Sequence, residues 1–307
     1  MRVSALAWVV LAAMPAGGHI ATVPQTVAAA DSTVVILLGT GVPRPDPLAA
    51  GPATAVVVGS RTFLFDAGTG VERQLSAAKL PINGVTALFV THLHSDHTLG
   101  LPDLIFTSWV MGRDKPLAAY GPRGLGAMVD HIIAAWSEDI AIRTNGLEHE
   151  TPGGYRVAVH EIAPGVIYDS GGVKITAIPV LHGDWKEAYG YRIDTPTRSI
   201  VISGDTRPSP ALLAAATGVD VLIHEAYPEG RVAPERRPGG GDWPKYMRAF
   251  HTSDVELGRM AAAARPRLLI LYHVASRMGA PDEELIAGVH RGGFAGAVMI
   301  GKDLARY

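Results

Sequence analysis

Thr91-His92-Leu93-His94-Ser95-Asp96-His97 brings three histidines and an aspartate together within six residues, directly after an apolar run that predicts a strand. Alternate side chains of an extended segment point the same way, so His92 and His94 can reach one metal ion. Asp96 and His97 lie on the following turn, where they can reach a second ion about 3.5–4 Å from the first. The pattern is not typical of core packing and predicts a dinuclear metal site.

Further ligands are expected elsewhere, because one short segment cannot complete two coordination spheres. His182, Asp205 and His273 each lie just past a run of apolar residues that predicts a strand. Loops at the carboxyl ends of strands converge to form sites in open sheets, so we expect these three residues to complete the centre. The chain has no cysteine. Imidazole and carboxylate ligands then suit two divalent ions, with zinc expected and manganese or iron as alternatives.

The full sequence has 48% apolar and 18% charged residues, and beyond residue 31 it alternates between strand and helix patterns. Predicted strands cover residues 33–38, 54–58, 62–65, 85–90, 173–179, 189–193, 199–203, 219–223 and 268–272; predicted helices cover 71–78, 208–217, 253–264 and 281–290. Strands in hairpins that also alternate with helices predict two sheets covered by outer helices, an αββα sandwich forming one domain over residues 31–307. Residues 228–250 are rich in proline and glycine and predict a long loop, either a lid or a surface excursion.

The first thirty residues have a different pattern. Arg2 precedes an apolar run over residues 3–14, and small residues follow up to Ala30. This is typical of a secretory signal peptide, with cleavage expected after Ala30 or alternatively near Ala16. The apolar run is too short to cross a membrane, and a buried N-terminal strand or helix is the alternative. We therefore expect a periplasmic or secreted protein with no membrane span after the signal is removed.

The order of these motifs resembles the metallo-β-lactamase superfamily over residues 34–302, nearly all of the expected mature chain. Phe65-Asp66-Ala67-Gly68 is similar to the first motif of that superfamily, whose aspartate orients the metal-binding loop. A bridging aspartate resembles the phosphodiesterase, lactonase and glyoxalase-like branches rather than the members that hydrolyse antibiotics. The resemblance implies two ligand sets joined by one carboxylate: His92, His94 and His182 for one ion, Asp96, His97 and His273 for the other, and Asp205 between them.

Two shorter motifs narrow the resemblance. His224-Glu225-Ala226 and His251-Thr252-Ser253 are similar to elements of ribonuclease Z and its arylsulfatase- and phosphodiesterase-like relatives. In that group the histidine lies beside the leaving group and the glutamate orients it. The resemblance therefore implies that His251 is a general acid or phosphate clamp and Glu225 its partner. The alternative is that His251 only caps its helix and Glu225 is a solvated charge.

Together these motifs predict an exported hydrolase that acts on a small-molecule phosphodiester or sulfate ester. A hydroxide bridging the two ions would be the nucleophile, since metal binding lowers the pKa of water from 15.7 to about 7. Asp96 could position this nucleophile in addition to binding metal. Trp185, Lys186 and Trp243 suggest an aromatic-lined pocket that would fit an aryl or nucleoside ester. The sequence is also compatible with a homodimer.

Three other functions stay open. A ribonuclease Z-type 3′-tRNA endonuclease would use the same site, and Gly121-Pro122 matches that family. Predicted export, a formal charge of −2 and the lack of a basic run between the second and third ligand motifs argue against a nucleic-acid partner. A lactonase or other carboxyl-ester hydrolase could use the same metal pair. A non-catalytic binding module is the third alternative, although degenerate relatives usually lose some ligands.

Overall fold

The computed structural model describes residues 32–234, 241–274 and 279–307. The predicted signal peptide therefore lies outside the described residues, and among those described no helix combines the length and apolarity needed to cross a membrane. The strands are β1 (Thr33–Gly39), β2 (Ala53–Val58), β3 (Arg61–Phe65), β4 (Val85–Phe89), β5 (Leu117–Gly121), β6 (Val157–Glu161), β7 (Gly165–Ser170), β8 (Val173–Pro179), β9 (Tyr189–Asp194), β10 (Ser199–Ile202), β11 (Val221–Ala226), β12 (Leu268–Val274) and β13 (Ala297–Ile300). The helices are α1 (Val71–Ala77), α2 (Ser95–Thr98), α3 (Leu101–Val110), α4 (Leu125–Ala135), α5 (Ser137–Asn145), α6 (Pro210–Ala215), α7 (Trp243–Phe250), α8 (Asp254–Ala264) and α9 (Asp282–Arg291), with short 3-10 helices η1 (Ile82–Gly84) and η2 (Glu229–Arg231).

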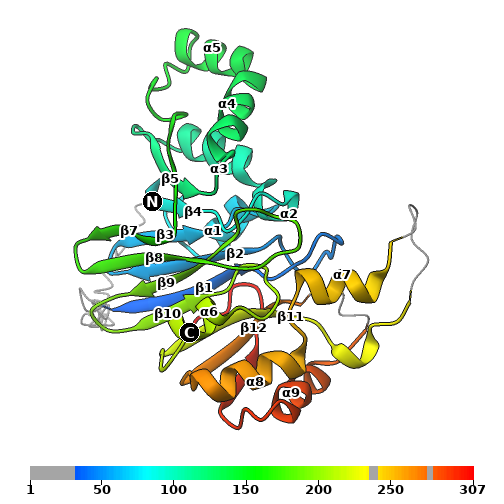
Figure 1. Ribbon diagram of the computed structural model, residues 1–307. Helices are drawn as coiled ribbons and strands as arrows, with labels where there is room; N and C mark the ends of the chain where they lie inside the picture. The colour runs from blue at the N-terminus through cyan, green and yellow to red at the C-terminus, as the bar shows by residue number, and fades with distance from the viewer. Residues whose placement is uncertain (1–31, 235–240, 275–278) are drawn as a thin grey trace, which may run out of the picture.

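Two mixed sheets stacked face to face form the centre of the molecule (Figure 1). The first has the strand order β1-β2-β3-β4-β5-β6, and the second has the order β13-β12-β11-β10-β9-β8-β7. Apolar side chains from both sheets share one buried core, in which Phe65 stacks on Phe89 with ring centroids 5.1 Å apart and both approach Tyr191 of the second sheet. This core fixes the two sheets against each other.

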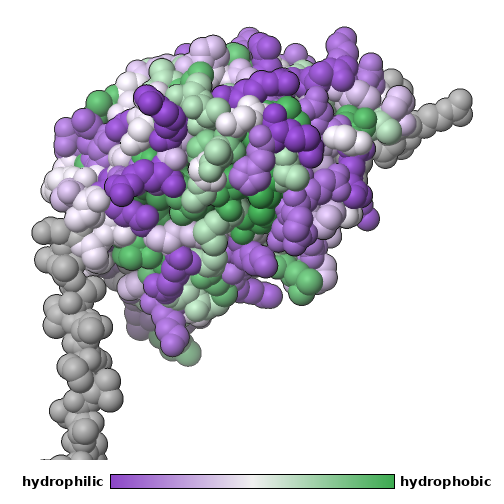
Figure 2. Space-filling view, turned by 90° about the horizontal axis from the view of Figure 1, so that it is seen from below, coloured by the Kyte–Doolittle hydropathy of each residue, from purple (hydrophilic) through white to green (hydrophobic). Residues whose placement is uncertain are grey.

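Helices cover the outer face of each sheet. Apolar residues of α1, α3 and α4 pack on the first sheet, and those of α6, α8 and α9 pack on the second. Seen from below, polar side chains surround a central group of apolar ones on the molecule's surface (Figure 2). The predicted single-domain αββα sandwich is confirmed.

Most predicted elements occur within two residues of their expected ends, because their burial patterns are local and regular. Strand β8 has the predicted bounds, and the predicted capping box closes the start of α8: Ser253 Oγ accepts from the Glu256 amide, and Glu256 accepts from the Ser253 amide. The strand expected at 219–223 is shifted to β11, because the Val219 amide closes a turn onto the Ala216 carbonyl.

The prediction that residues 228–250 form one loop is wrong. The described parts of this segment contain η2 and α7, and residues 235–240 lie outside the described residues. Asp242 caps α7 by accepting a hydrogen bond from the Lys245 amide at 3.0 Å, and Pro244 lies in its first turn. Proline favours the first turn of a helix, so a residue that suggested a loop in fact helps a helix to begin.

A buried carboxyl group lies in the outer helical layer. Glu72 on α1 is only 4% exposed, and neither of its carboxyl oxygens has a hydrogen-bond partner among the described residues. Burial, reinforced by Asp103 and opposed by Arg113, raises the pKa of Glu72 to about 8. Glu72 is therefore mostly protonated at neutral pH in the folded protein.

Glu72→Gln should stabilise the protein at alkaline pH. The pKa of Glu72 rises from 4.5 to about 8 on folding, so the free energy of unfolding falls as the pH rises from about 4.5 towards 8. Removing the ionisable group should raise the free energy of unfolding by about 3 kcal/mol at pH 8 and by much less at pH 5. Urea unfolding at the two pH values measures this, with Glu283→Gln on the surface of α9 as the control. Equal gains at both pH values would contradict the burial argument.

Candidate metal centre

The seven predicted ligands meet at one end of the two sheets. His92 follows β4, His182 follows β8 and Asp205 follows β10, each at the carboxyl end of its strand. Their ligand atoms form two groups, and within each group these atoms lie within 4.8 Å of one another. The groups match the sets implied by the resemblance: His92, His94, His182 and Asp205 in one, and Asp96, His97 and His273 in the other.

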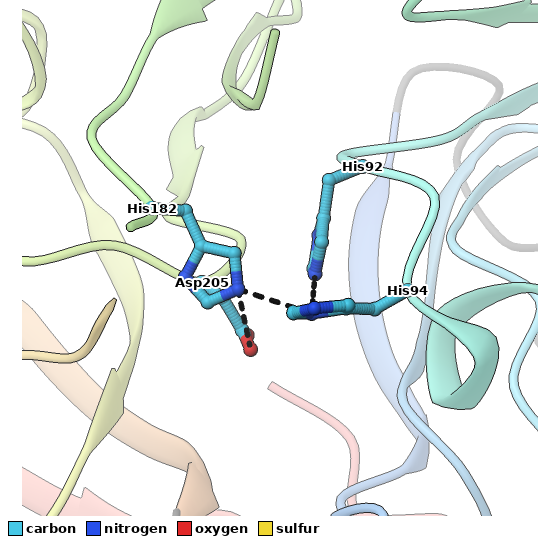
Figure 3. A group of neighbouring side chains, drawn as sticks. All are labelled: His92, His94, His182 and Asp205. Carbon is cyan, nitrogen blue, oxygen red and sulfur yellow. Dashed lines mark hydrogen bonds and ion pairs between the residues drawn. The ribbon is translucent and has the colours of Figure 1, made fainter. Parts of the chain in front are cut away.

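Three histidines of the first group direct one nitrogen each to a common point (Figure 3). His94 Nδ1 lies 2.9 Å from His92 Nε2 and 3.1 Å from His182 Nε2. The other nitrogens of His92 and His182 are held from behind, by Thr91 Oγ1 at 3.0 Å and the Phe250 carbonyl at 2.8 Å. With those two Nδ1–H groups engaged, at most one proton can lie among the three converging nitrogens of neutral rings. This arrangement fits a cation.

The second group contains buried atoms that lack partners. Asp96 Oδ2 lies 3.6 Å from both His97 Nε2 and His273 Nε2. Asp96 Oδ2, His97 Nε2 and Asp205 Oδ1 are buried without a hydrogen-bond partner among the described residues. Buried polar atoms are almost always paired, so three unpaired atoms that face one another fit a second cation.

Asp205 lies between the two groups. Its Oδ1 is 3.5 Å from His97 Nε2, and its Oδ2 is 3.1 Å from His273 Nε2 and 3.9 Å from His182 Nε2. Although burial favours its neutral form, His273 and His97 hold the pKa of Asp205 well below its usual range. Asp205 therefore places an ionised carboxylate where it can contact both cations.

The environment prepares the two groups differently for metal binding. Burial lowers the pKa of His92 well below its usual range and lowers those of His94 and His182 to about 4. Against the effect of burial, Asp205 and Asp66 raise the pKa of His97. Histidine binds a metal as neutral imidazole, so the first group is already in its binding form, while protons compete with metal in the second.

Asp66 supports ligands of both groups from behind. Its Oδ1 accepts from the Thr91 amide at 2.8 Å, and its Oδ2 accepts from Thr91 Oγ1 at 2.9 Å and from His97 Nδ1 at 2.8 Å. Thr91 Oγ1 in turn contacts His92. Carboxylates behind ligand histidines fix the orientation of the ring and raise its basicity. The geometry agrees with the orienting role that the resemblance implied for Asp66.

His273 reaches the centre through a bulge in β12. Tyr272 pairs with Glu225 and Val274 pairs with Ala226, so His273 is an extra residue in the ladder, with a left-handed φ of 43°. Bulges redirect a side chain and are common beside active sites. The sequence predicted a strand ending at residue 272, and the structure continues it to Val274.

Asp303 was not predicted from the sequence, yet it holds the loop behind His273. Its Oδ1 accepts from the Thr40 amide and hydroxyl at 2.9 and 2.8 Å, and its Oδ2 accepts from the Ala50 amide at 2.7 Å. The Gly41 amide donates to the Ala50 carbonyl, and the Gly41 carbonyl accepts from His273 Nδ1 at 2.6 Å. Asp303 therefore orients a predicted ligand through the loop.

Asp303→Ala should weaken binding of the second metal ion by about tenfold, because His273 loses its fixed support. Loss of an outer partner typically costs about 10- to 100-fold in metal affinity, and Asp303 acts through one further layer. Titration against a chelator measures the affinity. Asp46→Ala, an exposed acid in the same loop, is the matched control. Equal affinity in the Asp303 and Asp46 variants would show that the loop does not support His273.

His251 and Glu225 meet beside the metal centre. His251 directly follows α7, and its Nδ1 lies 3.0 and 3.1 Å from the two Glu225 oxygens and 4.0 Å from Asp205 Oδ2. Glu225 is fully buried on β11 and also accepts from the Thr206 amide at 2.9 Å. Glu225 is thus not a solvated charge, and Ser253 rather than His251 caps α8. The geometry leaves His251 Nε2 as the nitrogen available to a substrate.

The protonation of this pair depends on what lies beside it. Burial lowers the pKa of His251 to about 4, whereas burial and then Asp205 raise the pKa of Glu225 well above its usual range. A phosphate anion next to His251 would favour the imidazolium, because an opposite charge raises the pKa of a histidine. An anionic substrate would therefore recruit the proton that a general acid needs.

A pocket of about 610 Å³ opens beside the first group of ligands. Trp185 and Lys186 line the pocket, as the sequence suggested. Trp243 does not line it. The Trp243 ring stacks on Tyr246, with ring centroids 5.1 Å apart, and packs in a separate small cluster. Phe250, at the end of α7, lines the pocket instead. The full lining comprises Leu93, His94, Pro122, Arg123, Asp184, Trp185, Lys186, Glu187 and Phe250.

Comparisons with known proteins agree with the fold and the site. The family model described as "Beta-lactamase superfamily domain" matches residues 61–274. The chain therefore belongs to the metallo-β-lactamase superfamily, a class of proteins whose fold implies divalent metal ions.

Its homologues include ribonuclease Z proteins. Ribonuclease Z of Mycobacterium sp. (strain KMS) is 35% identical over 279 residues, which cover 89% of this chain and 94% of the relative. Among solved structures, the metallo-β-lactamase fold protein YhfI from Bacillus subtilis has a TM-score of 0.69 and 20% identity, covering 90% of this chain and 99% of its own. Human tRNase Z, short form, has a TM-score of 0.65 and 23% identity, covering 89% and 98%. These two structures show a shared fold.

Proposed function

We propose that the protein is a metal-dependent phosphodiesterase of ribonuclease Z type, which cleaves precursor tRNA at its 3′ end. The observation that carries this proposal is the contact between His251 and Glu225, with His251 Nδ1 4.0 Å from Oδ2 of Asp205. This contact occurs in a chain that is 35% identical to a ribonuclease Z. The sequence motifs alone favoured hydrolysis of small-molecule esters and left this function as an alternative. The homologues favour it because their similarity covers 89% of the chain.

Different side chains of the site would have different roles in hydrolysis. Two divalent cations held by the seven ligands would activate water and neutralise charge on the phosphate. Asp96 directs Oδ2 towards His97 and His273, which leaves Oδ1 to orient the attacking water. As the bond from phosphorus to the leaving oxygen breaks, His251 donates its Nε2 proton to that oxygen while Glu225 holds Nδ1.

A second candidate is an exported hydrolase of small phosphodiesters or sulfate esters. Helices α4 and α5 project beyond the first sheet (Figure 1), and Arg143 is the only lysine or arginine in residues 125–145. Arg143 on α5 is paired with Asp139 at 3.0 Å and with Glu148. Binding of a nucleic-acid backbone requires cations that neutralise phosphates. Export, which remains our proposal for residues 1–30, would also separate the protein from tRNA precursors.

A substrate panel with purified, metal-loaded protein tests the proposal. It contains a tRNA precursor with a 3′ trailer, bis-p-nitrophenyl phosphate, p-nitrophenyl sulfate and an acyl-homoserine lactone. We expect cleavage of the tRNA precursor and the phosphodiester, with both activities lost in Asp205→Ala. Cleavage of the small phosphodiester or the sulfate alone would favour the second candidate. Activity on the lactone alone would refute both.

His251→Ala should lower kcat by about 10²–10⁴-fold on the RNA substrate, because a ribose oxygen leaves poorly without a proton. The loss should be much smaller on bis-p-nitrophenyl phosphate, because p-nitrophenolate leaves without protonation. For Glu225→Gln, which keeps a partner for His251 Nδ1, kcat on the RNA substrate should lie between the values for the wild type and His251→Ala. Steady-state kinetics on both substrates measure the difference. Equal losses on the two substrates would contradict the role as general acid and indicate a phosphate clamp.

A further inference from the structure

We propose that the pocket beside His94 is a stacking site for a planar, uncharged ring attached to the scissile phosphate, with Trp185 as the stacking residue. The ring would be a nucleobase or an aryl group. This inference rests on the proposed function, because it assigns the pocket to the substrate of the same metal centre.

Trp185 lines the pocket, and the Nε1 edge of its indole ring points towards His94. Its Nε1 lies 2.9 Å from His94 Nε2, and the planes of the two rings are 88° apart with centroids separated by 4.9 Å. In this arrangement His94 covers an edge of the indole rather than a broad face. The side chain is half-buried and lines the pocket, so a substrate ring can lie on the indole face directly beside a predicted metal ligand.

Phe250 forms a rigid second wall. A Cβ added at Gly183, whose φ is +53°, would lie only 2.0 Å from Phe250 Cζ, so the phenyl ring rests against backbone that only glycine leaves free. Tyr246 stacks on Phe250 with ring centroids 4.3 Å apart. The Phe250 carbonyl also accepts from His182 Nδ1 at 2.8 Å. These contacts fix the wall relative to the metal centre.

The charges around the pocket favour a neutral group. The Arg123 amide donates to Glu187 Oε2 at 2.8 Å, and the Arg123 guanidinium lies 3.6 Å from Glu187 Oε1. Lys186 and Asp184 add one charge of each sign, and both are exposed. The two positive and two negative side chains leave the lining with no net charge that would attract a second phosphate or a carboxylate. Leu93 and Pro122 complete an apolar lining suited to a ring.

The pocket is large enough for such a group. Its volume of about 610 Å³ falls within the usual range for small-molecule sites. Stacking on an aromatic side chain typically contributes enough affinity that its loss weakens binding by about 5- to 150-fold per ring. A substrate that carries a ring should therefore bind more tightly than one with the same phosphate and only an alkyl group.

Calorimetric titration of the metal-loaded full chain tests this inference. The probes are methyl phosphate, phenyl phosphate and adenosine 5′-monophosphate. In the wild type we expect the two ring-bearing probes to bind about 5- to 150-fold more tightly than methyl phosphate. Trp185→Ala should abolish this ratio, and Trp185→Phe should restore most of it. Trp136→Ala, which removes an exposed tryptophan after α4, should leave the ratio unchanged, and metal content is measured for every variant.

The outcomes separate this inference from the proposed function, because binding requires no turnover. Equal affinities for all three probes in the wild type, or an unchanged ratio in metal-loaded Trp185→Ala, would overturn the stacking site even if RNA is cleaved. A ratio that depends on Trp185 would support the site even if no phosphodiester is cleaved. If adenosine monophosphate binds more tightly than phenyl phosphate, the pocket selects a nucleobase. If the two bind equally, the pocket accepts any planar ring.

Discussion

The carboxylate of Asp205, buried between two groups of histidines, is the constraint on which the site depends. An ionised carboxylate is costly to bury unless opposite charge compensates it. Here His97 and His273 lie within 3.5 Å of its two oxygens, and the turn after β10 holds it in place. Elements that are far apart in the sequence must therefore meet at one end of the sandwich, and the two sheets with their shared aromatic core keep that meeting point rigid.

Supporting contacts extend this rigidity outward from the ligands. Asp66 reaches ligands of both groups through Thr91 and His97, the Phe250 carbonyl holds His182, and the Gly41 carbonyl holds His273. The Phe250 contact has a second consequence, because the same residue lines the pocket where a substrate would enter. The predicted metal centre and this pocket thus share Phe250 at the end of α7.

Local patterns in the sequence were sufficient for the sandwich and for the set of candidate ligands. Apolar runs such as β8 and the capping box of α8 depend on neighbouring residues, so periodicity and spacing reveal them. Long-range contacts were not predictable in this way. Asp303 acts on a loop more than 250 residues earlier in the chain, and α7 begins within a segment whose prolines suggested a loop. Trp243 was misplaced for the same reason, since only the helix determines which side its ring faces.

We propose that the seven side chains would hold two metal ions, with the Asp205 carboxylate between the two ligand groups. Anomalous X-ray diffraction from crystals of the metal-loaded protein, measured at the absorption edge of the bound metal, tests it most directly. We expect two peaks about 3.5–4 Å apart. One should lie among His92, His94 and His182, the other among Asp96, His97 and His273, with the Asp205 carboxylate between them. A single peak, or peaks outside these two groups, would contradict it.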